Sequence, residues 1–146
     1  EGAYRMLNIT VLCVGTLKEQ YLRDAVKEYS KRIGGYARLS ITETQNDREL
    51  IPKLPKRAYK IALCVEGKQL SSEELSEKMQ DAAVNGYSDV VFVIGDSDGM
   101  GEDVKAACDF RLSFSKMTFP HQLMRVILLE QIYRALSIAN NGKYHK

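Results

Sequence analysis

Hydrophobic and polar residues alternate in blocks along this chain, and the blocks predict strands and helices in turn. Short apolar runs rich in branched residues predict buried strands over residues 7–14, 39–42, 59–65, 90–94 and 110–114. Apolar residues at helical spacing predict helices over 22–33, 72–84, 102–108 and 120–139. The polar stretch 46–57 contains two prolines and predicts an irregular connection or one short helical turn. Strands that alternate with helices, without repeats or a linker, favour one α/β domain around a mostly parallel sheet.

Local signals mark the ends of several predicted helices. Ser71 and Glu74 form the pattern of a capping box, in which each side chain binds the backbone N–H of the other residue. Gly34 and Gly86 follow periodic apolar segments and predict helix ends. Pro120 suits the first turn of the last helix, because a helix needs no N–H at that position.

The last predicted helix, 120–139, is apolar over most of its surface. Polar side chains are confined to a side that carries His121 and Arg125 and to a stripe with Glu130 and Arg134, which are spaced to form an ion pair. Such a helix is either the central core helix of a monomer or a helix buried against a second subunit. In a chain this short we expect the second arrangement, a homodimer.

The composition is that of a globular protein with a substantial core. The chain has 146 residues, of which 45% are hydrophobic and 27% charged. No apolar run approaches the roughly 20 residues that span a bilayer, and no secretory signal pattern is present, so we expect no membrane association and a cytoplasmic location. Residues 1–5 precede Met6, a natural start, and we expect them to lie outside a single domain of residues 6–146.

The three cysteines are Cys13, Cys64 and Cys108, which are far apart and set among apolar neighbours. Structural zinc sites use closely paired ligands, and disulfide frameworks use even numbers of cysteines. We therefore expect buried free thiols and no metal site.

Charge is distributed unevenly along the chain. Residues 111–146 carry six basic residues and one acidic residue, Glu130, whereas residues 1–110 carry 15 basic and 18 acidic ones. A concentrated positive end can recruit a phosphate backbone, but it can also be no more than an asymmetric solvated surface.

A glycine-rich loop, 95–101, follows the most strongly β-forming run of the chain. Its spacing matches neither a phosphate-binding loop, which closes with Gly-Lys-Ser/Thr, nor the Gly-x-Gly-x-x-Gly dinucleotide pattern. A calcium loop is excluded because apolar residues stand where oxygen ligands are needed. We expect Asp96, Ser97 and Asp98 to cap the following helix, and Gly95 to mark a place where a ligand approaches the backbone.

His121 and His145 are the only histidines of the chain. A lone histidine is more often a packed or capping residue than a catalyst. His121, however, begins a helix directly after a polar loop, and Arg125 lies one turn further on. Both interpretations of His121 stay open at the level of the sequence.

Several segments together resemble one enzyme family. They are Val91–Gly95, Leu112–His121, Arg125, Glu130–Ala135 and the closing Tyr144-His145-Lys146, with further matches at 9–18 and 67–73. In this order they resemble the ribosomal RNA large subunit methyltransferase H family, part of the SPOUT group of knotted enzymes that methylate RNA from S-adenosylmethionine. The resemblance covers nearly all of residues 6–146.

The resemblance implies a fold, an activity and a cofactor. The fold is a SPOUT-type α/β knot, a mostly parallel sheet with helices on both faces and a deep trefoil knot in the C-terminal half; knots are otherwise almost absent from proteins. The activity is methylation of N3 of a pseudouridine in the 23S rRNA of the assembled ribosome by a homodimer. The positions that match the family's S-adenosylmethionine contacts are Leu63, Gly95, Phe114, Ser115, Lys116, Met117, Thr118 and Phe119.

The residue types agree with that chemistry. Strand-end turns supply backbone groups in an apolar pocket, which suits the adenine and methionine parts of the cofactor. The protein then has to align donor and acceptor and to remove a weakly acidic proton, for which His121 and His145 are the two candidate bases. The catalytic residues that we expect are His121, Arg125, Tyr144 and His145. Among these and their neighbours, Arg125, Lys143 and Lys146 are expected to hold phosphates, and the tail aromatic to stack on an unpaired base.

Three features depart from the family pattern. Asp96 stands beside Gly95 where a second glycine is expected, the segment 43–57 is shorter than usual, and no arginine precedes Tyr144. Two other interpretations therefore stay open. One is a knotted methyltransferase that acts on transfer RNA, and the other is a non-catalytic ligand-binding homologue that has lost its RNA.

Overall fold

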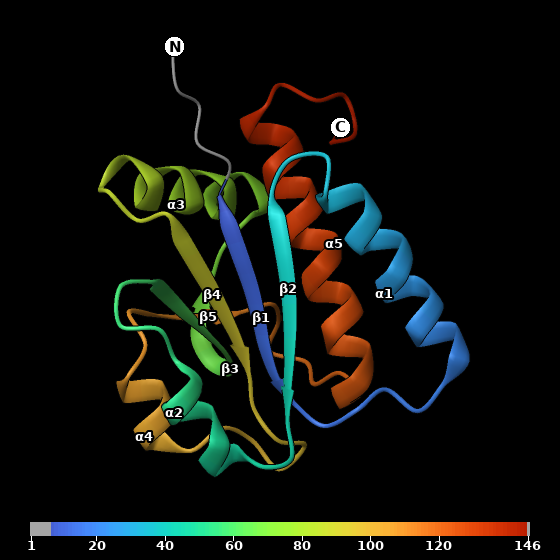
Figure 1. Cartoon of the computed structure of the whole chain (residues 1–146), viewed down its shortest axis with the longest axis vertical. Helices are drawn as coiled ribbons and strands as arrows, with labels where there is room; N and C mark the ends of the chain where they lie inside the picture. The colour runs from blue at the N-terminus through green and yellow to red at the C-terminus, as the bar shows by residue number, and fades with distance from the viewer. Residues whose placement is uncertain (1–6, 146) are drawn as a thin grey trace.

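A computed structural model describes residues 7–145, and within them a sheet of five strands forms the centre. The strands are β1 (Asn8–Val14), β2 (Arg38–Thr44), β3 (Tyr59–Gln69), β4 (Asp89–Ile94) and β5 (Phe110–Ser113). Their order is β2-β1-β4-β3-β5, and all neighbours run parallel (Figure 1). The predicted parallel α/β sheet is thus confirmed, whereas the knot stays a prediction. Residues 1–5 and Met6, where we expected the domain to begin, lie outside the described residues.

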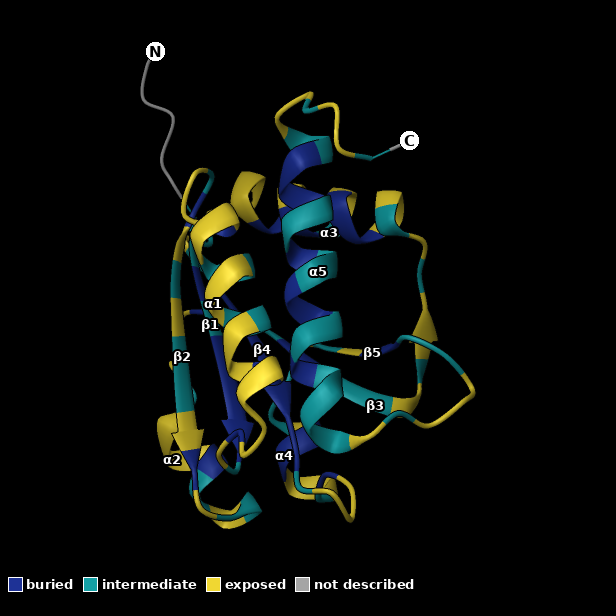
Figure 2. Cartoon of the chain, turned by 90° about the vertical axis from the view of Figure 1, so that its right-hand side faces the viewer, coloured by how far each residue is buried: buried dark blue, intermediate teal, exposed yellow. Residues whose placement is uncertain are grey.

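Helices cover both faces of the sheet. On one face α5 (His121–Ala139) packs between α1 (Gln20–Ile33) and α3 (Ser72–Val84) (Figure 2). The short helices α2 (Leu50–Lys53) and α4 (Glu102–Ala106) cover the other face. A 3₁₀ turn, η1 (Asp47–Glu49), precedes α2, so the stretch predicted to hold at most one helical turn holds two.

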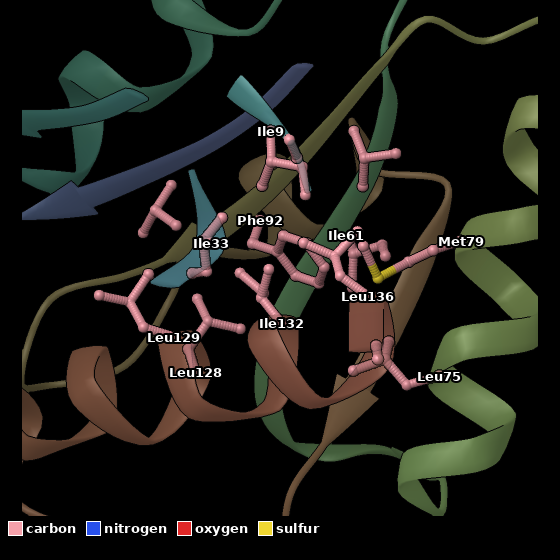
Figure 3. Close-up of a cluster of buried hydrophobic side chains, with 14 of the residues drawn as sticks. Ile9, Ile33, Ile61, Leu75, Met79, Phe92, Leu128, Leu129, Ile132 and Leu136 are labelled. Atoms are coloured by element: carbon pink, nitrogen blue, oxygen red, sulfur yellow. The ribbon is translucent and has the colours of Figure 1, made fainter. Parts of the chain in front are cut away.

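Successive residues of the central strands enter two separate cores, because both faces of the sheet are covered. On the side of α5, Ile9, Ile61 and Phe92 pack against Leu129 and Ile132 (Figure 3). The residues that enter the opposite core, around α2 and α4, are Leu12, Val14, Leu50, Ala58, Ala62, Val91, Val93, Met100 and Val104. Two-sided burial explains why strands β1 and β4 read as continuous apolar runs.

The first turn of α3 is held by the predicted capping box. Ser71 Oγ accepts a hydrogen bond from the backbone N–H of Glu74 at 3.0 Å, and Glu74 Oε1 accepts one from the N–H of Ser71 at 2.8 Å. The capping prediction is confirmed. The box fixes the start of α3, where Glu73 Oε2 in the same turn lies 3.0 Å from His145 Nε2.

Strand β3 is longer than predicted and contains an irregularity that shapes the site. Leu63 and Lys68 both pair with Leu112 of β5, so residues 64–67 form a bulge between them. A Cβ atom on Gly67 would lie 2.7 Å from the carbonyl carbon of Arg111. A glycine is required there because the bulge passes directly over the backbone of β5.

Candidate functional site

A cavity of about 420 Å³ opens where β3, β4 and β5 lead into their following loops. Of the predicted cofactor residues, those that line it are Leu63, Gly95, Phe114, Ser115, Met117, Thr118 and Phe119. Lys116 is exposed and does not line it. The structure therefore brings together three segments that lie far apart in the sequence, as ligand sites at the carboxyl ends of parallel strands do.

The loop after β4 forms the side of the cavity that carries Gly95. Gly99 has a φ of +105°, and its N–H donates to the carbonyl oxygen of Asp96 at 2.9 Å, which closes a tight turn. A Cβ on Gly95 would lie 2.8 Å from the Cβ of Met100. The glycine at this position is therefore required by the packing of Met100 as well as by any ligand.

The polar residues of this loop do not cap the next helix, so that prediction is wrong. The N-cap of α4 is Gly101, and no side chain caps it. Asp96 Oδ1 instead accepts from the backbone N–H of Ser97 at 2.6 Å, within the loop itself. Gly99, Met100 and Gly101 separate Asp98 from the first residue of α4, so Asp98 does not stand at a capping position.

Asp47 from η1 holds the end of this loop, although no sequence pattern singled it out. Its Oδ2 accepts a hydrogen bond from the backbone N–H of Gly101 at 3.0 Å. A Cβ on Gly95 would also lie 3.2 Å from its Oδ1. Because 54 positions separate Asp47 from Gly101, only the fold could reveal this contact.

The loop after β5 is shaped by two serine side chains. Ser113 Oγ donates to the carbonyl oxygen of Ser115 at 3.0 Å, and Ser115 Oγ accepts from the N–H of Met117 at 3.0 Å. These local bonds leave other backbone groups of the loop free to meet a ligand. Met117 is 75% exposed at the rim and Phe119 is partly buried, so the loop also offers apolar surface.

His121 lines the cavity at the start of α5. Its Nε2 lies 2.9 Å from the carbonyl oxygen of Val14, a group that only accepts, so Nε2 carries the proton. Within residues 7–145, Nδ1 has no hydrogen-bond partner. In the tautomer that satisfies the contact with Val14, Nδ1 carries the lone pair.

The side chain of Arg125, one turn further along α5, is hydrogen-bonded to other residues of the same chain. Its side chain is only 4% exposed. Its Nη1 donates to Glu43 Oε2 at 2.5 Å, and its Nη2 donates to the carbonyl oxygen of Gly15 at 3.0 Å. Arg125 therefore fastens α5 to the carboxyl ends of β1 and β2.

The tail docks beside the C-terminal half of α5, and none of its described residues lines the cavity. Tyr144 Oη donates to Glu130 Oε1 at 2.9 Å, and the Tyr144 ring packs against Tyr133 with centroids 4.8 Å apart. The predicted ion pair of Glu130 with Arg134 is confirmed at 2.8 Å. Arg134 lies 13 residues beyond His121, about 20 Å along a helix. Within one chain, the tail and the cavity are two separate sites; Lys146 lies outside the described residues.

Both ring nitrogens of His145 are engaged. Arg134 Nη1 donates to Nδ1 at 3.0 Å, and Nε2 lies 3.0 Å from Glu73 Oε2. The tautomer with its proton on Nε2 satisfies both contacts. The hydrogen bond from His145 lowers the pKa of the Glu73 carboxyl. The docked His145 consequently has no free lone pair.

Comparison with known proteins agrees with this architecture. A family model described as "Predicted SPOUT methyltransferase" matches residues 7–145. The chain belongs to the SPOUT methyltransferase family. Two relatives of this SPOUT chain, from Clostridium novyi (46% identical) and Clostridioides difficile (43%), are named ribosomal RNA large subunit methyltransferase H. In each case the match covers 96% of this chain and all of the relative.

The fold of this SPOUT chain also resembles a solved structure at low sequence identity. The SpoU methyltransferase AviRb from Streptomyces viridochromogenes, solved in complex with the cofactor AdoMet, matches with a TM-score of 0.55 and 12% identity. The match covers 97% of this chain and 61% of AviRb. The likeness supports the predicted SPOUT fold class.

Membrane-spanning helices and metal-binding clusters are both absent from the described part of this SPOUT chain. No helix within 7–145 has the length and apolarity to cross a membrane. The same residues contain no group of three or more histidine, cysteine or acidic side chains arranged to hold a metal ion.

Proposed function

We propose that this protein is a homodimeric, S-adenosylmethionine-dependent methyltransferase of 23S rRNA that modifies N3 of a pseudouridine in the assembled ribosome. The observation that carries the proposal is the convergence of three distant loops, those after β3, β4 and β5, on one cavity in a SPOUT chain. The names of the Clostridium novyi and Clostridioides difficile relatives support rRNA as the substrate.

The cavity fits the proposed cofactor. Its volume of about 420 Å³ lies within the usual range for small-molecule sites, and apolar side chains and loop backbone form much of its wall. The bound cofactor supplies a methyl group that a sulfonium already activates. The loops around Gly95 and Ser115 supply backbone groups to orient it, and Phe114 and Phe119 exclude water around it.

A second copy of the chain completes the proposed site. The outward face of α5 leaves Leu123, Val126 and Ile127 partly exposed. Beside it lies a hollow of about 310 Å³ that shares Phe114 and Phe119 with the main cavity. A partner packed on this face covers apolar surface and brings its own tail toward the cavity, which the described tail of the same chain does not line.

In this arrangement His121 is the proposed general base. His121 lines the cavity, and its Nδ1 is unengaged within residues 7–145, so we assign Nδ1 to accept the N3 proton of the target base. His145 and Tyr144 serve to place the RNA, since the tail contacts occupy both nitrogens of His145. Arg125 acts as a positioning residue that fixes the start of α5 rather than as a phosphate ligand.

Methyl transfer to defined substrates tests the proposal. Purified protein with radiolabelled S-adenosylmethionine is offered ribosomes, 50S subunits, free 23S rRNA and transfer RNA in parallel. We expect label on 23S rRNA in ribosomes, at N3 of a pseudouridine by mass spectrometry. Labelling of transfer RNA alone would favour the tRNA enzyme, and cofactor binding without any transfer would favour the non-catalytic homologue.

A further inference from the structure

Two oppositely charged side chains stand together in the wall of the cavity. Glu66 comes from the bulge of β3 and Lys105 from α4, and both line the cavity. They form a salt bridge in which the Lys105 side chain is 9% exposed and the Glu66 side chain 53% exposed. Lys105 is thus a nearly buried cation whose partner carboxylate reaches solvent.

The pair is held in place from both sides. The bulge that carries Glu66 is fixed by the passage of Gly67 over the backbone of Arg111. Lys105 also bonds to Glu102 at 3.3 Å, and Glu102 lies 3.7 Å from Arg111. The hydrogen bond between the pair raises the pKa of Lys105 and lowers the pKa of Glu66, so both groups are ionised at neutral pH.

Lys105 is the single lysine or arginine among the described residues that line the cavity. The acidic residues of the lining are Glu66, Asp96 and Asp98. Asp96 accepts hydrogen bonds from its own loop. Lys105 is therefore the one lysine or arginine of the described lining that a ligand carboxylate can contact in this cavity. The partly exposed carboxylate of Glu66 lies beside it.

We propose that Glu66 and Lys105 form the subsite for the α-amino-acid end of the ligand. Lys105 donates to the ligand α-carboxylate, and Glu66 accepts from its α-ammonium. An α-amino acid carries these two charges on one carbon, so a fixed pair of opposite charges is complementary to it. The inference rests on the proposed function, which identifies the ligand as S-adenosylmethionine with its methionine end.

Calorimetry with two ligands that differ only at that end tests the subsite. S-adenosylhomocysteine carries the amino acid, whereas 5′-methylthioadenosine keeps the adenosine and the thioether without it. We expect Glu66→Gln and Lys105→Met each to weaken S-adenosylhomocysteine by roughly tenfold or more, the usual size for a lost charge-assisted contact. Binding of 5′-methylthioadenosine should stay within about twofold of wild type.

Glu102→Gln is the matched control, because it removes a charge beside Lys105 at a residue that does not line the cavity, while the amide oxygen can still accept from Lys105 and hold it in place. It should leave both ligands near their wild-type affinity. Parallel losses for both ligands, or no loss for S-adenosylhomocysteine in the Glu66→Gln protein, would overturn the subsite alone. Wild-type protein that binds neither ligand would overturn the proposed function and the subsite together. The Glu66 side chain is half exposed, so Glu66→Gln keeps the experiment decisive where Lys105→Met fails to fold.

Discussion

Arg134 donates a hydrogen bond to Nδ1 of His145 across 3.0 Å, and this contact ties the tail to the last turns of α5. The same arginine bonds to Glu130, which also accepts from Tyr144. The tail is therefore an ordered surface feature built on α5, with its aromatic ring packed on Tyr133. No described residue of the tail lines the cavity, so mutations can alter the two sites separately within one chain.

Deleting residues 143–146 should abolish methyl transfer while it leaves folding and cofactor affinity near wild type. The tail touches α3 and α5 from outside and does not line the cavity. Ribosome binding should weaken and depend less on salt, because each lost phosphate contact reduces counterion release. Transfer rates, calorimetry and salt-dependent binding measure these effects. An unchanged transfer rate in the truncated protein would remove the tail from the mechanism.

His121→Gln should lower the single-turnover methylation rate by roughly 10²-fold or more, the usual contribution of a positioned general base. His145→Gln should weaken ribosome binding and slow the chemical step less, because the tail already occupies both ring nitrogens of His145. S-adenosylhomocysteine affinity, measured in parallel, controls for damage to the cavity. If the two variants exchange these phenotypes, His145 is the base.

Arg125→Met should lower the free energy of unfolding by about 3 kcal/mol, since it leaves Glu43 and the Gly15 carbonyl without their shared donor. Glu43→Gln should cost less, because Glu43 is 38% exposed and an amide can still accept from Arg125. Urea denaturation of both variants and the double mutant measures the coupling. Additive effects would contradict a direct interaction.

Neighbouring charge insertions on α5 should have different outcomes. Leu128 is completely buried in the core, so Leu128→Glu should prevent cooperative folding. Ile127 is partly exposed beside the hollow next to the cavity, so Ile127→Glu should fold but shift the dimer toward monomer in light scattering. Val84→Glu, at a position 85% exposed, serves as the control. A wild-type monomer at micromolar concentration would contradict the proposed dimer.

The thiols of Cys13 and Cys108 should be inert at neutral pH. Cys13 is buried, whereas Cys64 and Cys108, which were also predicted to be buried, are only partly buried. Burial raises the pKa of Cys13 and of Cys108 from 9.0 to about 11. Native protein at pH 7.5 should therefore react with iodoacetamide at neither residue, as peptide mass spectrometry will show. Because both pKa values are raised on folding, this contribution to stability is complete below pH 9 and is lost as the pH rises toward 11. Rapid labelling of Cys13 at pH 7.5 would mean that the core opens locally.

The sequence by itself determined the elements of this protein and a part of the cavity lining. A run such as Val90–Ile94 is apolar at every position, and this pattern predicts a strand that is buried on both faces of a sheet. The capping box of Ser71 and Glu74 could also be predicted from the sequence, because it depends only on two residue types at a fixed spacing. The segments around Gly95 and Ser115 were found because their residues matched a family, and parallel strands bring such loops to one edge.

Only the tertiary structure decided which side chains meet. Asp47 reaches the loop at Gly101 across 54 positions, and nothing in either segment encodes that contact. Arg125 was expected to face RNA, yet burial against Glu43 turns it inward. Glu66 enters the cavity only because Gly67 lets the β3 bulge pass over β5. Periodicity and capping act within a few residues, whereas partners of charged groups are set by how distant elements pack, which a single sequence does not display.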